Sequence, residues 1–259
     1  MTPSPVLSPI ERPTLSAQVA RHLLALINSE QLRPGDGVPS EMRISQDLQI
    51  SRGSVREAYR SLAALGILEI EGGRRPRLRV VDASVLGQVF DYALNTAQVS
   101  LAHVLETRRA IELQTAQLAA RYADEAQRKR LRELVTQMRT AGHDHARRIA
   151  ADADIHHVIA AASGNPLHAL LLGALGTPVK ASARMHLAET RPESELLRVI
   201  DAHEAVVDRI CAGDPMGAQS AMSYHFDLAM VHVQRQGDRN SAESGAGPGA
   251  GSSIGVIST

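Results

Sequence analysis

The chain has 259 residues, enough for two domains of ordinary size, and its 28 basic and 28 acidic residues leave no net charge, so overall charge points to neither a nucleic acid nor a membrane surface. The single cysteine, Cys211, excludes a disulfide framework and a thiolate metal cluster. No apolar run approaches the ~20 residues of a membrane helix and residues 1–13 lack a secretion signal, so a cytoplasmic protein is expected.

The two ends of the chain differ in composition from the part between them. Residues 1–13 are rich in Pro and Ser and are expected to form a flexible lead. Residues 236–259 are rich in Gly, Ser and Ala, with little to bury, and are expected to be disordered. Residues 1–81 hold 11 arginines against 8 acidic residues. This small excess favours an anion-binding N-terminal domain.

The first predicted element is a helix. Thr14 can cap it, and Leu15, Val19, Leu23 and Ile27 recur at helical spacing. The stretch LRPGDGVPS that follows reads as a loop, because Pro and Gly favour turns.

A helix-turn-helix pattern comes next. Ser40 can cap a short helix to about Leu48, and Ser51 can cap a second helix that ends before Gly66. The stretches ILEIE and RLRVV read as strands joined by GGRRP. This order of elements predicts a winged helix-turn-helix domain over residues 14–81.

Two arginines, Arg52 and Arg56, lie four residues apart at the start of the second helix of this motif. Residues so spaced share a helix face, and a recognition helix enters the major groove by its N-terminal end. Arginine can contact guanine with two hydrogen bonds, and Ser51 can donate to a phosphate. The alternative is a solvated face with an incidental ion pair, such as Arg56 with Glu57. The arginine-rich segment GGRRPRLR favours DNA.

The remainder of the chain up to residue 235 reads as helices without strand candidates. Asp124 with Gln127 forms a capping box, and Gly213, Asp214 and Pro215 combine a helix stop with a new helix start. An all-α bundle of six or seven helices is therefore predicted over residues 84–235. The helices are expected at about 85–96, 100–122, 124–141, 144–163, 166–190 (as two packed helices), 192–212 and 215–234.

Four polar residues lie on helix faces that should be buried. Asp152 and His156 are four apart on one apolar stripe, whereas His203 and His225 each lie on the apolar stripe of a later helix. A carboxylate on an apolar face is costly unless it is paired or bound to a cation. Three imidazoles and one carboxylate suit zinc, nickel, manganese or iron. The pattern favours a divalent metal site inside the bundle.

Two alternatives stay open at this point. Taken singly, each of these histidines is more often a hydrogen-bonded core histidine than a ligand. Asp154 with His157 is the rival register, although the stripe of His157 is less bulky. We interpret the histidines outside these helix faces as surface or incidental residues: His143, His145, His186 and His232.

The N-terminal motifs resemble a known family. The segments LRPGDGVPSE and ISRGSVREAYRSLAALGILE are similar to the DNA-binding domain of the GntR family of bacterial transcription regulators, over about residues 14–81. Met42 stands where the family usually has arginine, and the wing tip reads GRRPRLRV. The resemblance implies that operator DNA is bound by Arg43, Ser51, Arg52, Ser54 and Arg56. Because the wing tip departs from the usual Gly-Thr or Gly-Ser, we expect its Arg74, Arg75 and Arg77 to add a phosphate or minor-groove contact.

The C-terminal motifs resemble the FCD effector-binding domain, which defines the FadR subfamily of GntR regulators. DADIHHVIAAASGNP follows the pattern Asp-x-x-Phe-His and then Asn, with Ile155 in place of Phe. DAHEAVVDRICAGDPMGAQSAMSYHFDLA follows the later motif with two histidines. The resemblance covers about residues 84–235. It implies a divalent metal, often zinc, held by Asp152, His156, His203 and His225.

The same resemblance implies an effector that is a small organic acid. The segment ETRRAIE is similar to the family pattern Glu-x-Arg-x-x-x-Glu, which makes Arg108 the expected clamp for a carboxylate. Arg109 is the structural alternative on the outer face, and Arg184 is a further candidate of the same type.

A homodimer on a palindromic operator is expected, because one recognition helix covers only one half-site. Two other functions remain as alternatives: a regulator for which the metal ion itself is the signal, and a metal-dependent enzyme. We do not expect an enzyme, since the sequence offers no separate general acid or base motif.

Overall fold

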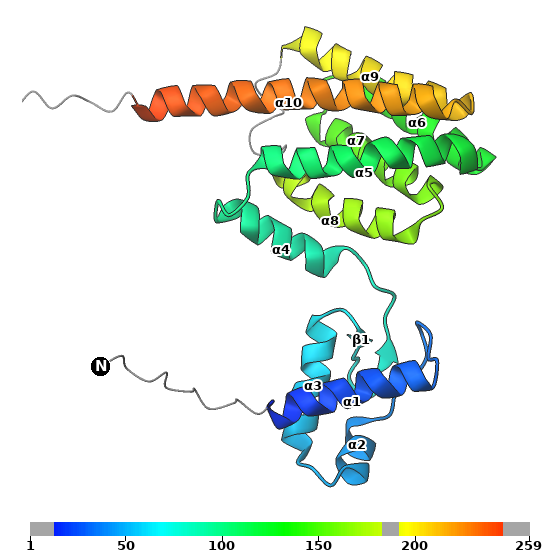
Figure 1. Cartoon of the computed structure of the whole chain (residues 1–259), viewed down its shortest axis with the longest axis vertical. Coiled ribbons are helices and arrows are strands. Elements are labelled where there is room, and N and C mark those ends of the chain that lie inside the picture. The colour runs from blue at the N-terminus through cyan, green and yellow to red at the C-terminus, as the bar shows by residue number, and fades with distance from the viewer. Residues whose placement is uncertain (1–12, 183–191, 246–259) are drawn as a thin grey trace, which may run out of the picture. The chain divides into compact units, whose positions relative to one another are not determined.

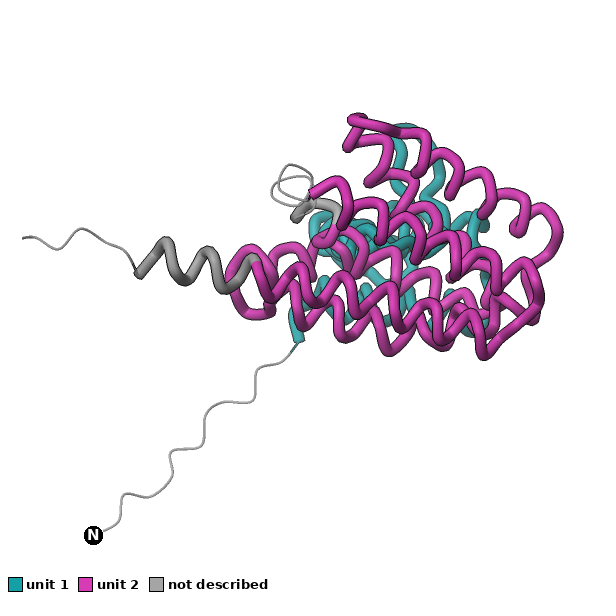
Figure 2. The backbone as a smooth tube through the Cα atoms, turned by 90° about the horizontal axis from the view of Figure 1, so that it is seen from above, with its two compact units in different colours: residues 1–85 teal, residues 86–259 magenta. Residues whose placement is uncertain are grey.

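A computed structural model describes the backbone of residues 13–182 and 192–245, and the side chains of residues 13–179 and 192–235. The chain divides into two units, residues 1–85 and residues 86–259 (Figure 2). Within the described residues, no helix combines the length and the apolar character needed to span a bilayer.

The first unit contains three helices and a two-stranded antiparallel sheet, in the order predicted for a winged helix-turn-helix (Figure 1). The strands are shorter than expected, at two residues each, with Leu68 opposite Leu78. Val80 and Val81 continue the predicted second strand but are exposed, with no strand beside them in the described part of the unit. The elements are α1 (Leu15–Ser29), α2 (Glu41–Asp47), α3 (Arg52–Ala64), β1 (Leu68–Glu69) and β2 (Arg77–Leu78).

Local capping fixes where these helices begin. The side chains of Thr14, Ser40 and Ser51 each accept a hydrogen bond from the backbone N–H three residues later, as predicted. Gly66 follows α3 with φ of 70°, a conformation in which glycine carries no side-chain penalty. The buried side chain of Tyr59 joins α3 to the preceding loop, since its hydroxyl donates to the Pro39 carbonyl at 2.5 Å.

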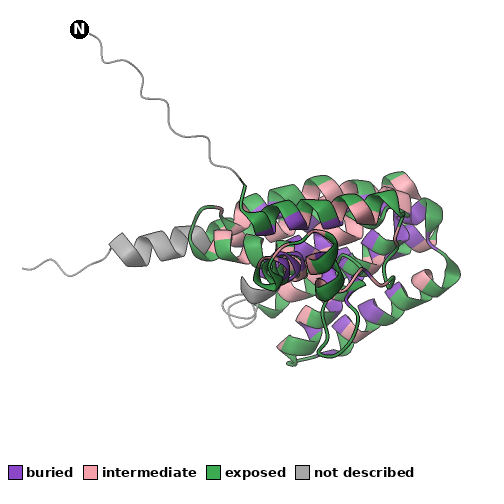
Figure 3. Ribbon diagram, turned by 90° about the horizontal axis from the view of Figure 1, so that it is seen from below, coloured by how far each residue is buried: buried purple, intermediate pink, exposed green. Residues whose placement is uncertain are grey.

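The second unit is made of helices alone in its described part, so the prediction of an all-α domain is confirmed. Helix α10 packs against α5 and α9, α6 packs against α7 and α9, and α7 packs against α8. Figure 3 shows that buried residues lie on one side of the helices and exposed residues on the other. The helices are α4 (Ser84–Asn95), α5 (Leu101–Tyr122), α6 (Glu125–Thr140), α7 (His145–Ala162), α8 (Pro166–Ser182), α9 (Glu193–Cys211) and α10 (Pro215–Gly245).

The start signals read from the sequence are present here too. Asp124 and Gln127 form the predicted capping box of α6. Asp214 accepts from the Gly217 N–H at the start of α10, directly after Gly213, which has φ of 67°. These local rules placed the helix boundaries because they depend on neighbours in sequence.

Two predicted boundaries were wrong. In the stretch 166–190, expected as two helices, the described part is one helix, α8, up to Ser182, with Pro178 inside it, and residues 183–190 lie outside the described residues. Leu172 and Leu175 are buried, and packing can keep a helix intact across a proline. The last helix was expected to end near Gln234 and residues 236–259 to be disordered, but α10 continues to Gly245, and no proline interrupts the chain before Pro248. Residues 246–259 lie outside the described residues.

Candidate functional site

Three buried histidines from three helices meet inside the second unit. His156 comes from α7, His203 from α9 and His225 from α10, and one ring nitrogen of each lies within 4.8 Å of the others. The centroids of the His203 and His225 rings are 4.2 Å apart. Asp152, one turn before His156, places its Oδ1 atom 3.0 Å from His203 Nε2. These are the four residues that the sequence predicted as metal ligands.

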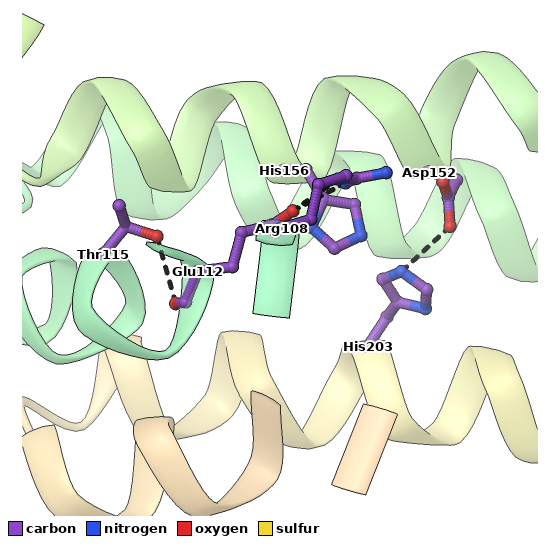
Figure 4. A network of polar contacts seen from close by, with 6 residues as sticks. All are labelled: Arg108, Glu112, Thr115, Asp152, His156 and His203. Carbon is purple, nitrogen blue, oxygen red and sulfur yellow. Dashed lines mark hydrogen bonds and ion pairs between the residues drawn. The ribbon is translucent and has the colours of Figure 1, made fainter. Parts of the chain in front are cut away.

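The outer nitrogens of two rings are held by neighbouring acceptors. His203 Nδ1 lies 2.8 Å from the Val199 carbonyl, which can only accept, so this nitrogen carries a proton and Nε2 is the nitrogen that faces Asp152. His156 Nδ1 contacts the Glu112 carboxylate (Figure 4). Ligating histidines typically bond a carbonyl or a carboxylate through their second nitrogen. Both rings therefore offer Nε2 to the cluster.

Glu112 on α5 is the residue that the sequence analysis missed. It is fully buried and also pairs with Arg108, whose Nε and Nη2 atoms lie 2.7 Å from Oε1 (Figure 4). The signal was present as the spacing of four between the arginine and the glutamate, but exposed helix pairs have the same spacing. Arg108 was predicted to clamp an effector, and in the structure its charge is balanced by Glu112.

The charge states of Asp152 and His225 suit metal ligands, whereas His203 differs: burial would lower its pKa, but Asp152 raises it, so this ring releases a proton when a metal binds. Burial would raise the pKa of Asp152, but His203 and the other two histidines lower it far below its usual value, so the carboxylate is ionised. Burial lowers the pKa of His225 well below its usual value, and the neighbouring rings add to this effect. A neutral imidazole and a charged carboxylate are the forms that bind metal.

The donors present fit a divalent transition metal. His225 Nδ1 is buried without a hydrogen-bond partner among the described residues, which is costly unless another group binds there. Nitrogen ligands with one carboxylate oxygen suit zinc, nickel, manganese or iron. The described residues can therefore hold a metal ion at this point.

A cavity of about 260 Å³ adjoins the cluster. Asp152, His156, His225 and Arg108 contribute to its polar wall. Its remaining wall is mostly aliphatic and aromatic, with Leu101, Leu105, Ile149, Leu172, Val179, Leu196, Val199, Ile200, Phe226 and Val233. A small organic molecule in this cavity would lie beside the three rings.

Asp154 and His157 line the cavity but lie outside the histidine cluster. His157 is exposed, and the half-exposed Asp154 lies 3.7 Å from Arg130 on α6, so this register does not join the histidine cluster. Arg109 faces outward and bonds Ser223 and Asp227. Arg184 lies outside the described residues.

Two histidines taken as incidental have defined surroundings. His145 lines the cavity. His232 is buried, and its Nδ1 lies 3.8 Å from Glu195, so its assignment to the surface was wrong. His143 is exposed as expected, and His186 lies outside the described residues.

In the first unit, the predicted DNA-reading residues lie on and beside the start of α3. Arg52 and Arg56 are exposed, and Arg56 Nε lies 3.6 Å from Glu41 of α2 rather than beside Glu57. Ser51 and Ser54 share a hydrogen bond of 3.0 Å between their hydroxyls. Arg43 is exposed and pairs with Asp47 on its own helix.

The wing arginines have backbone partners within the first unit. Arg75 Nε donates to the Val38 carbonyl at 2.8 Å, and Arg77 Nη1 donates to the Gly35 carbonyl at 2.8 Å. A Cβ on Gly37 would lie 3.0 Å from Arg75 Cδ, so glycine permits this close approach. Arg74 pairs with Glu71. Both Arg75 and Arg77 remain exposed and can still reach a phosphate.

Two family profiles match the chain. Residues 15–77 match bacterial regulatory proteins of the gntR family, and residues 103–228 match the FCD domain. The first match covers the helix-turn-helix and the wing, and the second covers the three histidines, Asp152 and Glu112.

Similar proteins match the chain over most of their length. The chain is 28% identical to the HTH-type transcriptional regulator LutR of Bacillus subtilis, over 78% of this chain and 93% of that protein. It is 27% identical to the HTH-type transcriptional repressor NanR of an Enterobacter species, over 89% of this chain and 90% of that protein. The solved structure of a Streptococcus agalactiae GntR protein is 26% identical and superposes with a TM-score of 0.65, over 84% of this chain and 99% of that one.

Proposed function

The chain belongs to the GntR family of bacterial transcription regulators and carries an FCD domain, and on this premise we propose that a small organic acid bound beside a divalent metal controls its affinity for operator DNA. The observation that carries the proposal is the buried cluster of three histidines at the wall of a 260 Å³ cavity. Asp152, His156, His203 and His225 would hold the ion, with zinc the first choice for such ligands.

The charge balance of the site supports an acid as effector. Arg108 and Glu112 cancel, and Asp152 offsets one charge of a divalent ion, which leaves about one positive charge in a buried place. An anion would remove that charge, whereas a neutral ligand would not. The ion would supply a Lewis-acidic position that a carboxylate oxygen can occupy.

The adjoining cavity favours an organic effector over the ion as signal. A site that senses the ion alone needs its ligands and no space beside them. Here the cavity extends from the ligands along an apolar wall, as in sites for small molecules.

DNA recognition is assigned to Arg52, Arg56 and Ser51 at the start of α3, with Arg43, Ser54 and the wing arginines in support. We propose a homodimer on a palindromic operator, because one recognition helix reads one half-site. The effector site lies in the second unit, so the acid must act by favouring one arrangement of the two recognition helices over another.

Metal content and ligand binding test the proposal together. Purified protein should contain about one divalent ion per chain, and a His203→Ala/His225→Ala variant should lose it, whereas His157→Ala should keep it. Zinc at about 100 times its Kd should stabilise the stripped wild-type protein by about 2.7 kcal/mol. Full metal occupancy in the double variant, measured by elemental analysis, would mean that these residues are only core histidines.

A further inference from the structure

Arg148 is a buried arginine at the cavity that the proposed function does not use. It lies in the first turns of α7 and is only 7% exposed, yet it lines the same cavity as the histidine cluster. Within the described residues, no carboxylate lies within ion-pair distance of it. This differs from Arg108, whose charge is balanced by Glu112.

The contacts of Arg148 leave most of its donors available. Nη1 donates to the Gly142 carbonyl at 2.7 Å, and Nη2 donates to His145 Nδ1 at 2.5 Å. A guanidinium has five N–H donors and no acceptor, so two contacts do not saturate it. Burial lowers the pKa of Arg148, and the negative charge of Asp144, one turn earlier, opposes this effect only in part.

His145 is oriented by the same contact. Because arginine only donates, Nδ1 of His145 must accept, and a neutral His145 ring then carries its proton on Nε2. His145 also lines the cavity. The first two turns of α7 thus offer two donor side chains beside the cavity, while Asp144 caps the helix N-terminus itself.

Arg148 lies on the same helix, α7, as two of the proposed metal ligands. Arg148, Asp152 and His156 follow one another at intervals of four residues, so they share one face. Each interval advances about one turn, or roughly 5.4 Å. Arg148 therefore lies one turn from the carboxylate ligand and two turns from the first histidine ligand.

The charge of the cavity then exceeds what one carboxylate can balance. Asp154 also lines it, but this half-exposed group already has Arg130 at 3.7 Å. With a divalent ion bound, Arg148 raises the net charge of the buried groups from about one to about two, and the exposed Asp144, which forms no ion pair with it, offsets this only in part.

Resting on the proposed function, we infer that the effector is a dicarboxylic acid, with one carboxylate at the metal and the second held by Arg148 and His145. The guanidinium fork suits a carboxylate, because it can donate two parallel hydrogen bonds. The aliphatic wall suits the methylene chain between the two acid groups. Arg148 is thus the residue that selects diacids over monoacids.

Calorimetry on the zinc-loaded full chain tests this with matched acids as probes. Succinate, glutarate and adipate are each compared with the monoacid of equal carbon number: butyrate, valerate and hexanoate. At least one diacid should bind roughly 10- to 100-fold more tightly than its monoacid, which is what hydrogen bonds to a charged group contribute. Arg148→Gln should abolish this preference, so that each diacid binds no more tightly than its matched monoacid.

Two controls separate selection from folding. Arg147→Gln removes the adjacent arginine, which is exposed, and should keep the preference. Arg148→Lys keeps the charge without the fork and should retain part of the preference, and each variant is accepted after its thermal unfolding matches the wild type. The comparison of acids on the wild-type protein needs no variant.

The outcomes distinguish the two proposals. If monoacids bind the zinc-loaded wild type and no diacid binds more tightly, Arg148 does not select a second carboxylate and this inference is wrong. If no acid of either kind binds, the inference fails as well, and the carboxylate effector of the proposed function fails with it. A preference for diacids that survives in Arg148→Gln would also overturn the role of Arg148.

Discussion

Glu112→Gln separates the structural role of the Arg108–Glu112 pair from its role at the metal. Glu112 is fully buried, and it is the only acidic partner within ion-pair distance of Arg108 in the described residues. Removing one partner of a buried ion pair costs about 3–5 kcal/mol, because the other charge is left uncompensated. Glutamine keeps the shape and one acceptor oxygen, so we expect a loss near 3 kcal/mol in unfolding free energy.

The same substitution should weaken metal binding. Glu112 accepts from His156 Nδ1, and changing such an outer partner typically lowers metal affinity 10- to 100-fold. Urea unfolding in a chelator gives the first quantity, and zinc competition with a chromogenic chelator gives the second. Glu106→Gln, an exposed glutamate on the same helix, is the control and should change neither.

A double variant divides the two effects. Arg108→Met/Glu112→Leu replaces the pair with apolar groups, which is often neutral for stability. It should recover most of the unfolding free energy but not the zinc affinity, since leucine cannot accept from His156. A Glu112→Gln loss below about 1 kcal/mol would place the pair in the range of solvated ion pairs and refute its burial. Unchanged zinc affinity in all variants would refute the orienting role of Glu112.

Three further outcomes are expected. Arg52→Ala and Arg56→Ala should each weaken operator binding by about 1–3 kcal/mol in a fluorescence titration, with Arg121→Ala on α5 as the exposed control, and unchanged affinity in both would remove them from the readout. Tyr59→Phe should lower the unfolding free energy of the first unit by about 0.5–1.5 kcal/mol, because the buried hydroxyl loses its bond to Pro39, and an unaltered urea midpoint would argue against that bond. Gly213→Ala should lower the unfolding free energy by about 1 kcal/mol, because Gly213 has a φ of 67°. Gly53→Ala inside α3 is the control and should not lower it, and equal unfolding free energies for the two variants would contradict the argument from φ.

Local signals in the sequence were sufficient for most of the helix boundaries. Ser40, Ser51 and Asp124 cap the helices that they were expected to cap, and the turn of Gly213 and Asp214 lies where expected. Each of these depends on a few adjacent residues. The end of α10 and the continuity of α8 across Pro178 depend instead on packing and solvent, which one sequence does not record.

The sequence also predicted the buried faces of the candidate site, but not which residues of different helices are in contact. Helical stripes marked Asp152, His156, His203 and His225 as buried, and the structure brings them together, although their role as ligands stays a prediction. The spacing of residues within one helix shows which of its faces is buried. It does not show which residues of another helix that face contacts.

Glu112 and Arg148 illustrate what spacing alone leaves out. Each has an ordinary sequence context: Glu112 follows Arg108 by four residues like many surface pairs, and Arg148 follows the exposed Arg147. Burial gives each of them its importance, and burial is set by helices that lie far away in the sequence.

The most direct test of the account is operator affinity measured with and without acid and metal. An operator duplex is first selected in vitro. Its Kd is then measured by fluorescence anisotropy for zinc-loaded and for chelator-stripped protein. Each measurement is made without acid and with a saturating concentration of the diacid that binds most tightly. The account predicts that the acid changes the Kd of the zinc-loaded protein by about 5- to 150-fold. It also predicts no change in the stripped protein or in His203→Ala/His225→Ala. An operator Kd that is the same with and without acid, in protein shown by calorimetry to bind that acid, would contradict the claim that the metal site regulates DNA binding.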